Sequence, residues 1–531
     1  MTFSSNFFHL FYLIQPDNTP AIVVFNDVIM KNALLIYPEY PVTFWGFKHA
    51  LKFIHCKAAY PPLGLLTVAS MLPADWEVKL VDLNVERLQD KQLEWADYVF
   101  ISAMNVQRPS AKEVIQRCKT HGKKIIAGGP LFTSDFSEFQ EVDYLVLNEA
   151  ELTLPGFLQD LANGTPKHIY STNAFADISV TPVPKWSLID MSNYATMNIQ
   201  YSRGCPYDCE FCDITLLFGR KVRTKSREQV IRELEAVHTA GWHNEIFFVD
   251  DNFIGNKPKL KNEILPAIAA WQSRFRIAHS FNTQVSIELA DDPALIKLMT
   301  SAGFDKVFVG IETPHEDSLK ECNKYKNANR NLISSVNVLQ NGGLEVAGGF
   351  IVGFDNDPSS IFDTQVRFIQ RSGIVTAMVG LLTALPDTKL YQRLYQENRI
   401  LKQSTGDNTD FSLNFIPRMK TEELMIGYQK LLITIYSPKE FYARIKIFLK
   451  EYNQTRRKRK PMSFFYMLAF IKSLFFIGFW NKSGFRFWNL LLWTLFNRPW
   501  LIKNSITFSI YGFHFRKILK MNIRRMRSAS I

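Results

Sequence analysis

The chain has 531 residues, of which 47% are hydrophobic and 21% are charged. This length and composition allow several domains with hydrophobic cores and exclude a fibrous or mainly disordered protein. The 62 Lys and Arg residues against 50 Asp and Glu give a net charge of +12, but residues 452–531 hold 16 of the basic residues and no acidic one. The tail therefore carries +16 and the first 451 residues carry −4, so the body of the protein is not basic.

Residues 1–30 are interpreted as an N-terminal extension. The apolar run 7–14 lacks the positive charge that precedes the apolar core of a signal peptide, because the first basic residue is Lys31. Six cysteines are too few for a disulfide scaffold in a chain of this length. We therefore expect a reducing, cytoplasmic compartment.

Short apolar runs alternate with helical patterns over residues 31–165, which we expect to form one domain. This alternation predicts an α/β fold with a doubly wound parallel sheet, whose ligand pocket lies at the carboxyl ends of the strands. Gly128 and Gly129 directly follow an expected strand and are candidates for that pocket. The expected strands are 33–37, 78–81, 98–102, 124–127 and 144–147, and the expected helices include 63–72 and 109–121.

A second βα series follows a Pro-, Thr- and Ser-rich stretch, residues 166–190, which indicates an interdomain linker. Six strands that alternate with helices such as 227–240 and 292–302 predict an incomplete parallel barrel over residues 191–390. From residue 391 to 531 the pattern is helical. The expected barrel strands are 197–201, 245–249, 277–281, 306–311, 346–352 and 376–382.

Three cysteines lie within eight residues, directly after the first strand of the second series. Cys205, Cys209 and Cys212 form a C-x3-C-x2-C pattern. Three thiols in one loop are typical of an iron–sulfur cluster or of zinc. A structural zinc site normally has a fourth ligand nearby, but no further Cys or His lies between Cys212 and His238. A cluster held by three ligands has one iron free to bind a small molecule.

With Phe211 at the aromatic position, this loop resembles the C-x3-C-x-aromatic-C signature of the radical S-adenosylmethionine superfamily. The resemblance implies that the three cysteines hold a [4Fe-4S] cluster and that S-adenosylmethionine binds its fourth iron. It also implies a one-electron reductant of the flavodoxin or ferredoxin type. Cleavage of S-adenosylmethionine then gives a 5'-deoxyadenosyl radical that removes hydrogen from an unactivated C–H bond.

Further positions match, in order and spacing, the strand ends that bind S-adenosylmethionine in this superfamily. The resemblance implies contacts with the methionine moiety, the ribose and the adenine, with glycines where the backbone must approach the cofactor closely. After the second strand this chain has Asp-Asp-Asn where the superfamily commonly has Gly-Gly-Glu. The candidate residues are Asp250, Asp251, Gln284, Ser286, Gly310, Glu312, Gly349 and Gly353.

A doubly wound domain in front of such a barrel resembles the cobalamin-binding members of the superfamily, especially hopanoid C-2 methylases and bacteriochlorophyll side-chain methylases. Residues 44–50, 61–66, 128–130 and 148–151 carry this resemblance. It implies cobalamin as a cofactor and methylation of an unactivated carbon in a small or lipid-like substrate. The Asp-x-His-x-x-Gly motif that supplies an axial histidine is absent, as in many radical methylases, which implies cobalamin without a protein ligand.

Three alternatives stay open from the sequence. A cobalamin enzyme of this layout could catalyse a cyclisation or rearrangement without methyl transfer. A tRNA-modifying methylthiotransferase shares the layout but needs three further N-terminal cysteines, and only Cys56 and Cys118 are available. An iron–sulfur electron carrier would not need the strand-end motifs. Cys56, Cys118 and Cys322 are interpreted as packing residues.

The tail, residues 452–531, holds 19 aromatic residues among 80. Its apolar runs are short and broken by charges, which disfavours a transmembrane helix. It forms either a helical subdomain packed on the barrel or amphipathic helices that contact the inner face of an anionic membrane. Nucleic acid is a less favoured partner, because long Phe, Leu and Ile runs suit packing or lipid better than base stacking.

Overall fold

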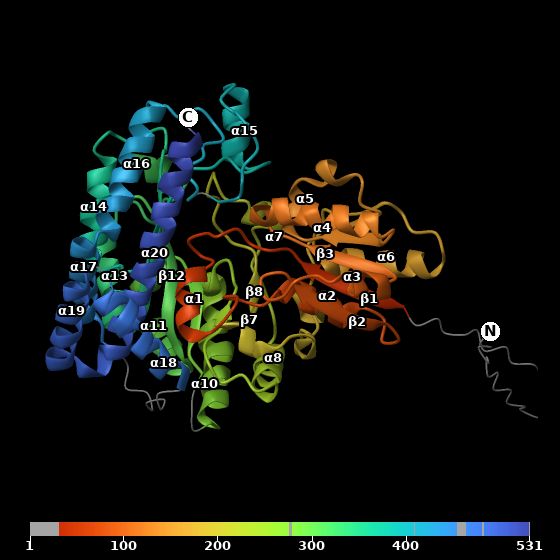
Figure 1. Cartoon of the computed structure of the whole chain (residues 1–531), viewed down its shortest axis with the longest axis horizontal. Helices are drawn as coiled ribbons and strands as arrows, with labels where there is room; N and C mark the ends of the chain where they lie inside the picture. The colour runs from red at the N-terminus through yellow and green to blue at the C-terminus, as the bar shows by residue number, and fades with distance from the viewer. Residues whose placement is uncertain (1–30, 276–278, 408, 454–463, 481–482, 530–531) are drawn as a thin grey trace, which may run out of the picture.

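The computed structural model describes residues 31–275, 279–407, 409–453, 464–480 and 483–529. Two α/β parts, each with its own six-stranded sheet, are followed by a helical part, most of which lies on the far side of the second sheet from the first (Figure 1). This arrangement confirms the predicted fold class.

The first sheet is parallel, with strand order β2-β1-β3-β4-β5-β6. Leu34, Leu35 and Ile36 in its centre are fully buried, as expected of a parallel sheet covered on both faces. The five predicted strands are present, and the expected linker adds β6 at the edge. The strands are β1 (Asn32–Tyr37), β2 (Glu77–Asp82), β3 (Tyr98–Ser102), β4 (Lys124–Gly128), β5 (Tyr144–Val146) and β6 (Ile169–Tyr170). The helices are α1 (Lys48–Ile54), α2 (Leu63–Met71), α3 (Asp90–Trp95), α4 (Arg108–Thr120), α5 (Pro130–Ser134) and α6 (Ala150–Ala162).

The second sheet is also parallel, and its order β14-β13-β12-β11-β10-β7 follows the chain. In the described residues β7 and β14 do not pair, so the sheet is an open barrel. Its strands are β7 (Met197–Ile199), β10 (Ile246–Phe248), β11 (Phe281–Val285), β12 (Phe304–Glu312), β13 (Glu345–Val352) and β14 (Ala377–Leu381). Its helices are α8 (Arg227–Thr239), α10 (Leu265–Ser273), α11 (Pro293–Ala302), α12 (Glu316–Glu321), α13 (Leu332–Asn341) and α14 (Ile361–Ser372). A hairpin of β8 (Ser202–Arg203) and β9 (Arg223–Thr224) brackets α7 (Ile214–Phe218) and the cysteines.

The third barrel strand lies further along the chain than predicted. The prediction was residues 277–281, of which 277 and 278 lie outside the described residues, whereas β11 begins at Phe281. Pairing of Phe281 with Ile246 and of Val285 with Val309 sets its position. The strand has three consecutive polar residues, Asn282 to Gln284, between Phe281 and Val285, so the preceding Ile-Ala pair gave the stronger hydrophobic signal.

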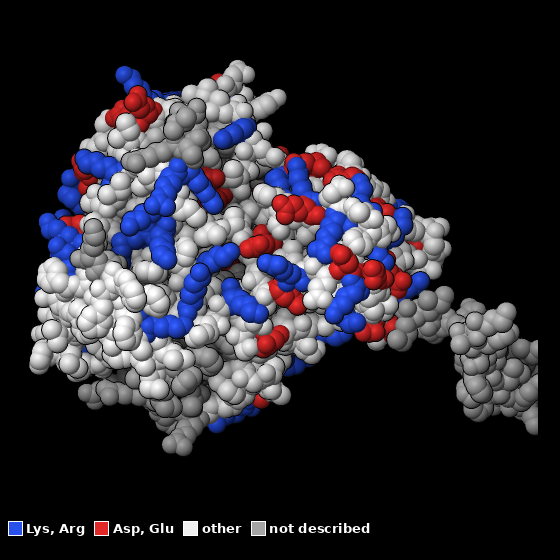
Figure 2. Space-filling view, in the orientation of Figure 1, with Lys and Arg blue, Asp and Glu red and all other residues white. Residues whose placement is uncertain are grey.

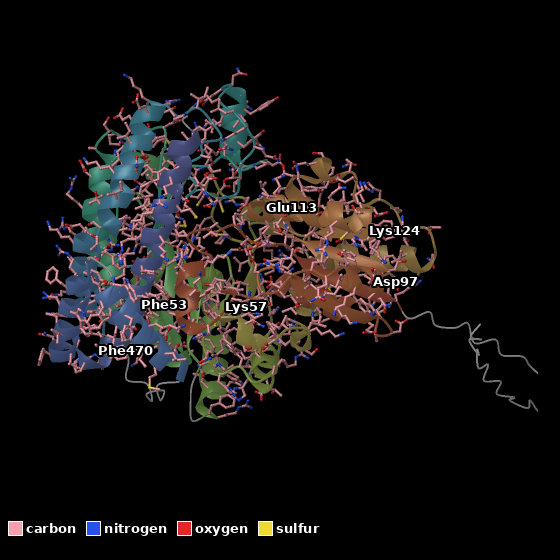
Figure 3. The ribbon with its side chains drawn as sticks, viewed as in Figure 1. Phe53, Lys57, Asp97, Glu113, Lys124 and Phe470 are labelled. Carbon is pink, nitrogen blue, oxygen red and sulfur yellow. The ribbon has the colours of Figure 1, made fainter. Side chains whose placement is uncertain are left out.

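The helical part covers the barrel and contacts α1 of the first α/β part. It consists of α15 (Lys389–Gln396), α16 (Thr421–Tyr436), α17 (Pro438–Glu451), α18 (Phe464–Ser473), α19 (Gly484–Asn497) and α20 (Ile502–Ala529). Helix α20 contacts both α16 and α1, and Phe515 on α20 stacks on Phe44 at a centroid distance of 4.2 Å. Figure 3 labels Phe53 on α1 and Phe470 on α18, two helices that also pack together. Among the described helices, none combines the length and the apolar character needed to cross a membrane.

Candidate functional site

The three predicted cysteines lie in the loop after β8, close to the carboxyl end of β7. Their thiols are free and partly buried. Among the described residues, one group of three His, Cys, Asp or Glu side chains has ligand atoms within 4.8 Å of one another, and it is a histidine cluster rather than these thiols. Three thiols in one loop, with no fourth Cys or His nearby in the sequence, are the ligand set expected of an iron–sulfur cluster with one open iron.

Asp250 and Asp251 after β10 hold the entry to the cysteine loop. Asp250 is fully buried and accepts hydrogen bonds from the backbone N–H groups of Tyr201 and Ser202 and from the Ser202 hydroxyl. Asp251 accepts one from the Gly204 N–H at 3.1 Å. Burial raises the pKa of Asp250 to about 7 and that of Asp251 to about 6. These carboxylates are occupied by the loop, and their direct contact with a cofactor stays a prediction.

Helix α15 fastens the other side of the loop. The Leu390 N–H donates to the Glu210 carbonyl at 2.9 Å, and the Arg393 guanidinium pairs with the Glu210 carboxylate at 2.6 Å. The Glu210 N–H donates to the Cys322 carbonyl at 3.1 Å, which ties the loop to α12 as well. The Phe211 ring packs near that of Phe354 at 6.3 Å. The cysteine loop is thus positioned by the end of β10, by α12 and by the helical part.

One buried polar atom without a hydrogen-bond partner lies where β10 ends. The side-chain oxygen of Asn252 accepts from the Ser286 N–H at 3.2 Å, but Asn252 Nδ2 has no partner. The Ser286 hydroxyl interacts with the side chain of Tyr207. Buried polar atoms normally form hydrogen bonds, so Asn252 Nδ2 is available to a polar ligand. Gln284, on β11, precedes Ser286 and is half-buried. Asn252 was not among the predicted site residues, although it is the last residue of the Asp-Asp-Asn sequence that follows β10.

Glu312 at the end of β12 has an unusual backbone and a buried partner. Its φ is 62°, and the register of β12 against β13 shifts between Gly310 and Glu312. The carboxylate pairs with Lys324 at 2.8 Å, and a Cβ on Gly310 would overlap it. Burial opposes the charge of Lys324, but Glu312 and then Cys209 raise its pKa well above the usual value. Nothing in the sequence pattern indicated Lys324.

The two other glycines predicted at the barrel site, Gly349 and Gly353, are required by close packing and by backbone conformation, respectively. A Cβ on Gly349 would lie 2.7 Å from Phe308 Cζ. Gly353 has a φ of 104°, a left-handed conformation that favours glycine, and its N–H donates to Asp357 at 2.8 Å. Both positions follow from the fold, and their contact with a cofactor stays a prediction.

The glycines of the first sheet lie at its carboxyl end, as predicted. A Cβ on Gly128 would overlap the Val146 carbonyl, and one on Gly129, whose φ is 88°, would overlap Ser102 Oγ. The loop after β1 extends from the same end of the sheet to the barrel. There Trp45 donates to Met378 Sδ at 2.6 Å and lies edge-on to Phe308 at 5.5 Å.

A buried ionic cluster also joins the two sheets. Arg203, two residues before Cys205, pairs with Glu149 and with Glu151 at 2.8 Å each, and Arg223 pairs with Glu149 at 2.8 Å. The carboxylates follow β5 of the first sheet, and the arginines lie on the hairpin that brackets the cysteine loop. Residues 148–151 carried part of the predicted resemblance, but their ion pairing had no sequence signal.

Family models match three consecutive regions of the chain. A B12 binding domain matches residues 53–158, the radical SAM superfamily matches residues 199–387, and a domain of unknown function (DUF4070) matches residues 388–528. The first match contains β2 to β5 of the first sheet, and the second contains the barrel strands from the end of β7 to β14.

Individual proteins agree with the family models. An uncharacterized methyltransferase of Synechocystis sp. is 39% identical over 92% of this chain and 93% of its own length. The hopanoid C-2 methylase of Rhodopseudomonas palustris is 32% identical over 78% of each chain. The solved structure of the cobalamin-dependent S-adenosylmethionine radical enzyme OxsB, with aqua-cobalamin and S-adenosylmethionine bound, has the same fold, with a TM-score of 0.61 and 15% identity over 94% of this chain and 80% of that one. The chain therefore belongs to the cobalamin-dependent radical S-adenosylmethionine methyltransferases, a family of enzymes that use a [4Fe-4S] cluster, S-adenosylmethionine and cobalamin.

Proposed function

We propose that this enzyme methylates an unactivated carbon of a lipid-like substrate in the space between the first sheet and the open barrel. Cys205, Cys209 and Cys212 hold the cluster, and Asn252 offers its unpartnered Nδ2 to S-adenosylmethionine. Bound there, the cluster supplies the electron for a radical reaction, and cobalamin at the first sheet supplies the methyl group. The chain's own side chains orient these groups and exclude water from them.

One observation carries methyl transfer: the two sheets present their carboxyl ends to each other. Trp45 extends from the end of β1 to Phe308 and Met378 on the barrel strands. Arg203, beside the cysteine loop, is held by Glu149 and Glu151 at the end of β5. A methyl donor bound at the first sheet thus faces a radical site at the cysteine loop, which is the juxtaposition that methyl transfer requires.

Anaerobic turnover with labelled S-adenosylmethionine tests methyl transfer. With cobalamin and a reductant, the protein should form both S-adenosylhomocysteine and 5'-deoxyadenosine. A Cys205→Ala, Cys209→Ala, Cys212→Ala variant should lose its iron and the 5'-deoxyadenosine product, whereas Cys118→Ala should keep both. Formation of 5'-deoxyadenosine without S-adenosylhomocysteine would favour rearrangement over methyl transfer.

A broad apolar surface on the helical part supports a lipid-like substrate. Figure 2 shows it as a largely white area over α19 and the segment between α18 and α19, with Lys and Arg side chains beside it. Trp480 and Phe496 are each 81% exposed. Arg486, Arg498 and Lys503 lie over neighbouring aromatic rings. We name this surface the aromatic face; it consists of Phe475, Phe476, Phe479, Trp480, Phe485, Leu492, Leu495, Phe496 and Trp500.

An exposed aromatic surface with basic residues along its border has the properties of a monotopic membrane contact. Aromatic side chains enter the headgroup region, and the adjacent cations attract anionic lipids. Charge complementarity thus favours an anionic bilayer as the partner of the aromatic face. A lipid-like substrate would then reach the barrel from the membrane surface.

Sedimentation with anionic phospholipid vesicles tests this contact. The protein should co-sediment, less so at high salt, because the basic border is screened. A Trp480→Ser, Phe496→Ser variant should remain largely in the supernatant. Tyr395→Ser, at a position that is 67% exposed on α15, is the matched control and should sediment like the wild type. Equal recovery of wild type in the supernatant with and without vesicles would contradict membrane contact.

A further inference from the structure

Three histidines converge at the end of the barrel opposite to the cysteine loop. His238 lies in the last turn of α8, His243 in the loop before β10, and His279 just before β11. Because the barrel strands are parallel, these amino ends lie at the other edge of the sheet from the carboxyl ends that hold the cysteines. The histidine cluster is therefore separate from the radical site.

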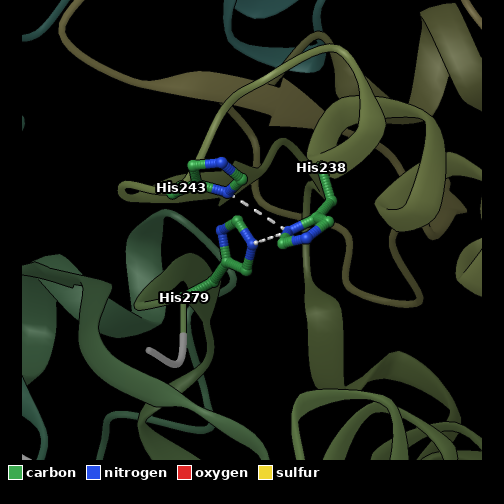
Figure 4. A group of neighbouring side chains, drawn as sticks. All are labelled: His238, His243 and His279. Carbon is green, nitrogen blue, oxygen red and sulfur yellow. Dashed lines mark hydrogen bonds between the residues drawn. The ribbon is translucent and has the colours of Figure 1, made fainter. Parts of the chain in front are cut away.

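The three rings place one nitrogen each around a common point (Figure 4). His238 Nδ1 lies 3.0 Å from His279 Nε2 and 3.3 Å from His243 Nδ1, and the three ligand atoms lie within 4.8 Å of one another. His279 is buried, His238 is half-buried and His243 is exposed. The cluster is thus anchored inside the protein and open to solvent on one side.

A backbone carbonyl orients the ring of His279 so that one of its nitrogens presents a lone pair to this common point. His279 Nδ1 lies 3.1 Å from the Asn244 carbonyl, so Nδ1 carries the proton and Nε2 presents its lone pair. Metal-binding histidines are commonly oriented by such a bond from the other ring nitrogen. One proton on His238 Nδ1 can be donated well to only one of its two nitrogen neighbours, whereas a cation accepts a lone pair from all three.

The neighbouring side chains leave the imidazoles as the ligands. The Phe275 ring lies 4.0 Å from that of His238, and the Trp271 ring stacks on that of His279 at 5.3 Å. Glu235 is already engaged by Trp271 Nε1 at 2.7 Å and by Arg274.

We propose that His238, His243 and His279 bind one divalent transition-metal ion of the zinc type. Imidazole suits zinc, nickel and copper, and three histidines with a fourth position open to solvent form a common tetrahedral arrangement. The ion joins the end of α8, the loop before β10 and the start of β11.

Zinc binding to the full-length protein tests this site. The cluster-loaded protein is dialysed anaerobically against Zn²⁺, and bound zinc is measured by elemental analysis. We expect one Zn²⁺ per chain, with binding weakened roughly tenfold or more in His243→Ala. His243 is exposed, so this variant should keep its fold, and His238→Gln provides a second one. His168→Ala is the matched control, because His168 Nδ1 also lies 3.0 Å from a backbone carbonyl, that of Asp143.

A second measurement separates the histidines from the cysteines. The Cys205→Ala, Cys209→Ala, Cys212→Ala variant should still bind one zinc ion, and X-ray absorption should show nitrogen and oxygen neighbours at about 2.0–2.1 Å without sulfur at about 2.3 Å. Zinc should raise the Tm of the wild type but not that of His243→Ala. Zinc binding that survives in His243→Ala and His238→Gln, or that is lost with the cysteines, would overturn the proposal.

Discussion

At the scale of single residues, the pair of Glu312 and Lys324 sets the charge beside the cysteine loop. Their side chains are 9% and 19% exposed and lie 2.8 Å apart. Lys324 also acts on the thiols of Cys209 and Cys212, where its charge opposes the effect of burial on their pKa values. A cation at this point therefore balances a buried carboxylate and favours thiolates over thiols.

Replacing Lys324 should show how much its ion pair with Glu312 contributes to the free energy of unfolding. Lys324→Met leaves Glu312 as an unpaired buried carboxylate, so we expect a loss of about 3 kcal/mol in the free energy of unfolding. Lys324→Met combined with Glu312→Gln should recover part of the loss, since the unpaired charge is gone. Urea unfolding of the two variants measures both values. Lys326→Met is the control, because that side chain is 56% exposed; a similar loss there would contradict the argument.

Gly310 should tolerate no side chain. A Cβ at this position would overlap the Glu312 carboxylate and lie 3.1 Å from Lys324 Nζ. Gly310→Ala should therefore reduce stability by about 1–3 kcal/mol and weaken binding of S-adenosylmethionine, because the ion pair must shift. Gly64→Ala, on α2 with nothing within 4 Å of the added Cβ, should be neutral or stabilising. Thermal unfolding and equilibrium binding of S-adenosylmethionine compare the two variants.

At the scale of elements, the hairpin β8–β9 connects the first sheet to the cysteine loop through Arg203. Burial alone would raise the pKa of Glu151, but Arg203 outweighs it and lowers that pKa to about 2. In the unfolded chain the pKa is about 4.5, so the folded state holds this proton less tightly. The resulting stability is complete above pH 4.5 and is lost as the pH falls toward 2. The difference corresponds to about 3 kcal/mol.

This pH dependence should disappear when the partner is removed. Arg203→Gln should destabilise the protein at pH 7, and its free energy of unfolding should fall less than that of the wild type between pH 5 and pH 3. Arg227→Gln, at an exposed position on α8, should follow the wild type. Urea unfolding of the three proteins across this pH range gives the slopes. Parallel slopes for wild type and Arg203→Gln would show that Glu151 is not linked to Arg203.

Elements with a strong hydrophobic period were predictable, and short or polar ones were not. The runs Leu34 to Ile36 and Ile125 to Ala127 are buried strand centres, as their sequences indicate. β6, β8 and β9 have two residues each and no detectable period.

At the site, the cysteine spacing located the loop. The polarity of Asp250 at a strand end, however, does not distinguish a carboxylate that holds backbone N–H groups from one that faces a ligand.

At the scale of the whole molecule, the described helices of the basic tail pack on the barrel and on α1 of the first α/β part. Helix α20 contacts α1, α16 and α17, and His514 Nε2 lies 3.0 Å from the Phe44 carbonyl. Burial lowers the pKa of His514 to about 4, so it remains neutral in this contact. The helical part thereby supports the loop that carries Trp45. The two predictions for the tail are compatible, since α20 packs inside while α19 and the segments on either side of it expose the aromatic face.

The position of the Trp45 loop should control how the two sheets cooperate. Trp45→Ala removes the contacts with Phe308 and Met378, so the methyl donor and the radical site lose their relative position. Because misplacement by about 1 Å can cost about 100-fold in rate, methylation of the substrate should fall by that order while 5'-deoxyadenosine still forms. The assay compares both products per cluster-loaded protein. Trp76→Ala, at the other end of the first sheet where Trp76 stacks on Tyr98, is the control and should keep the product ratio. An equal fall of both products in Trp45→Ala would instead show that the loop supports the cysteine site itself.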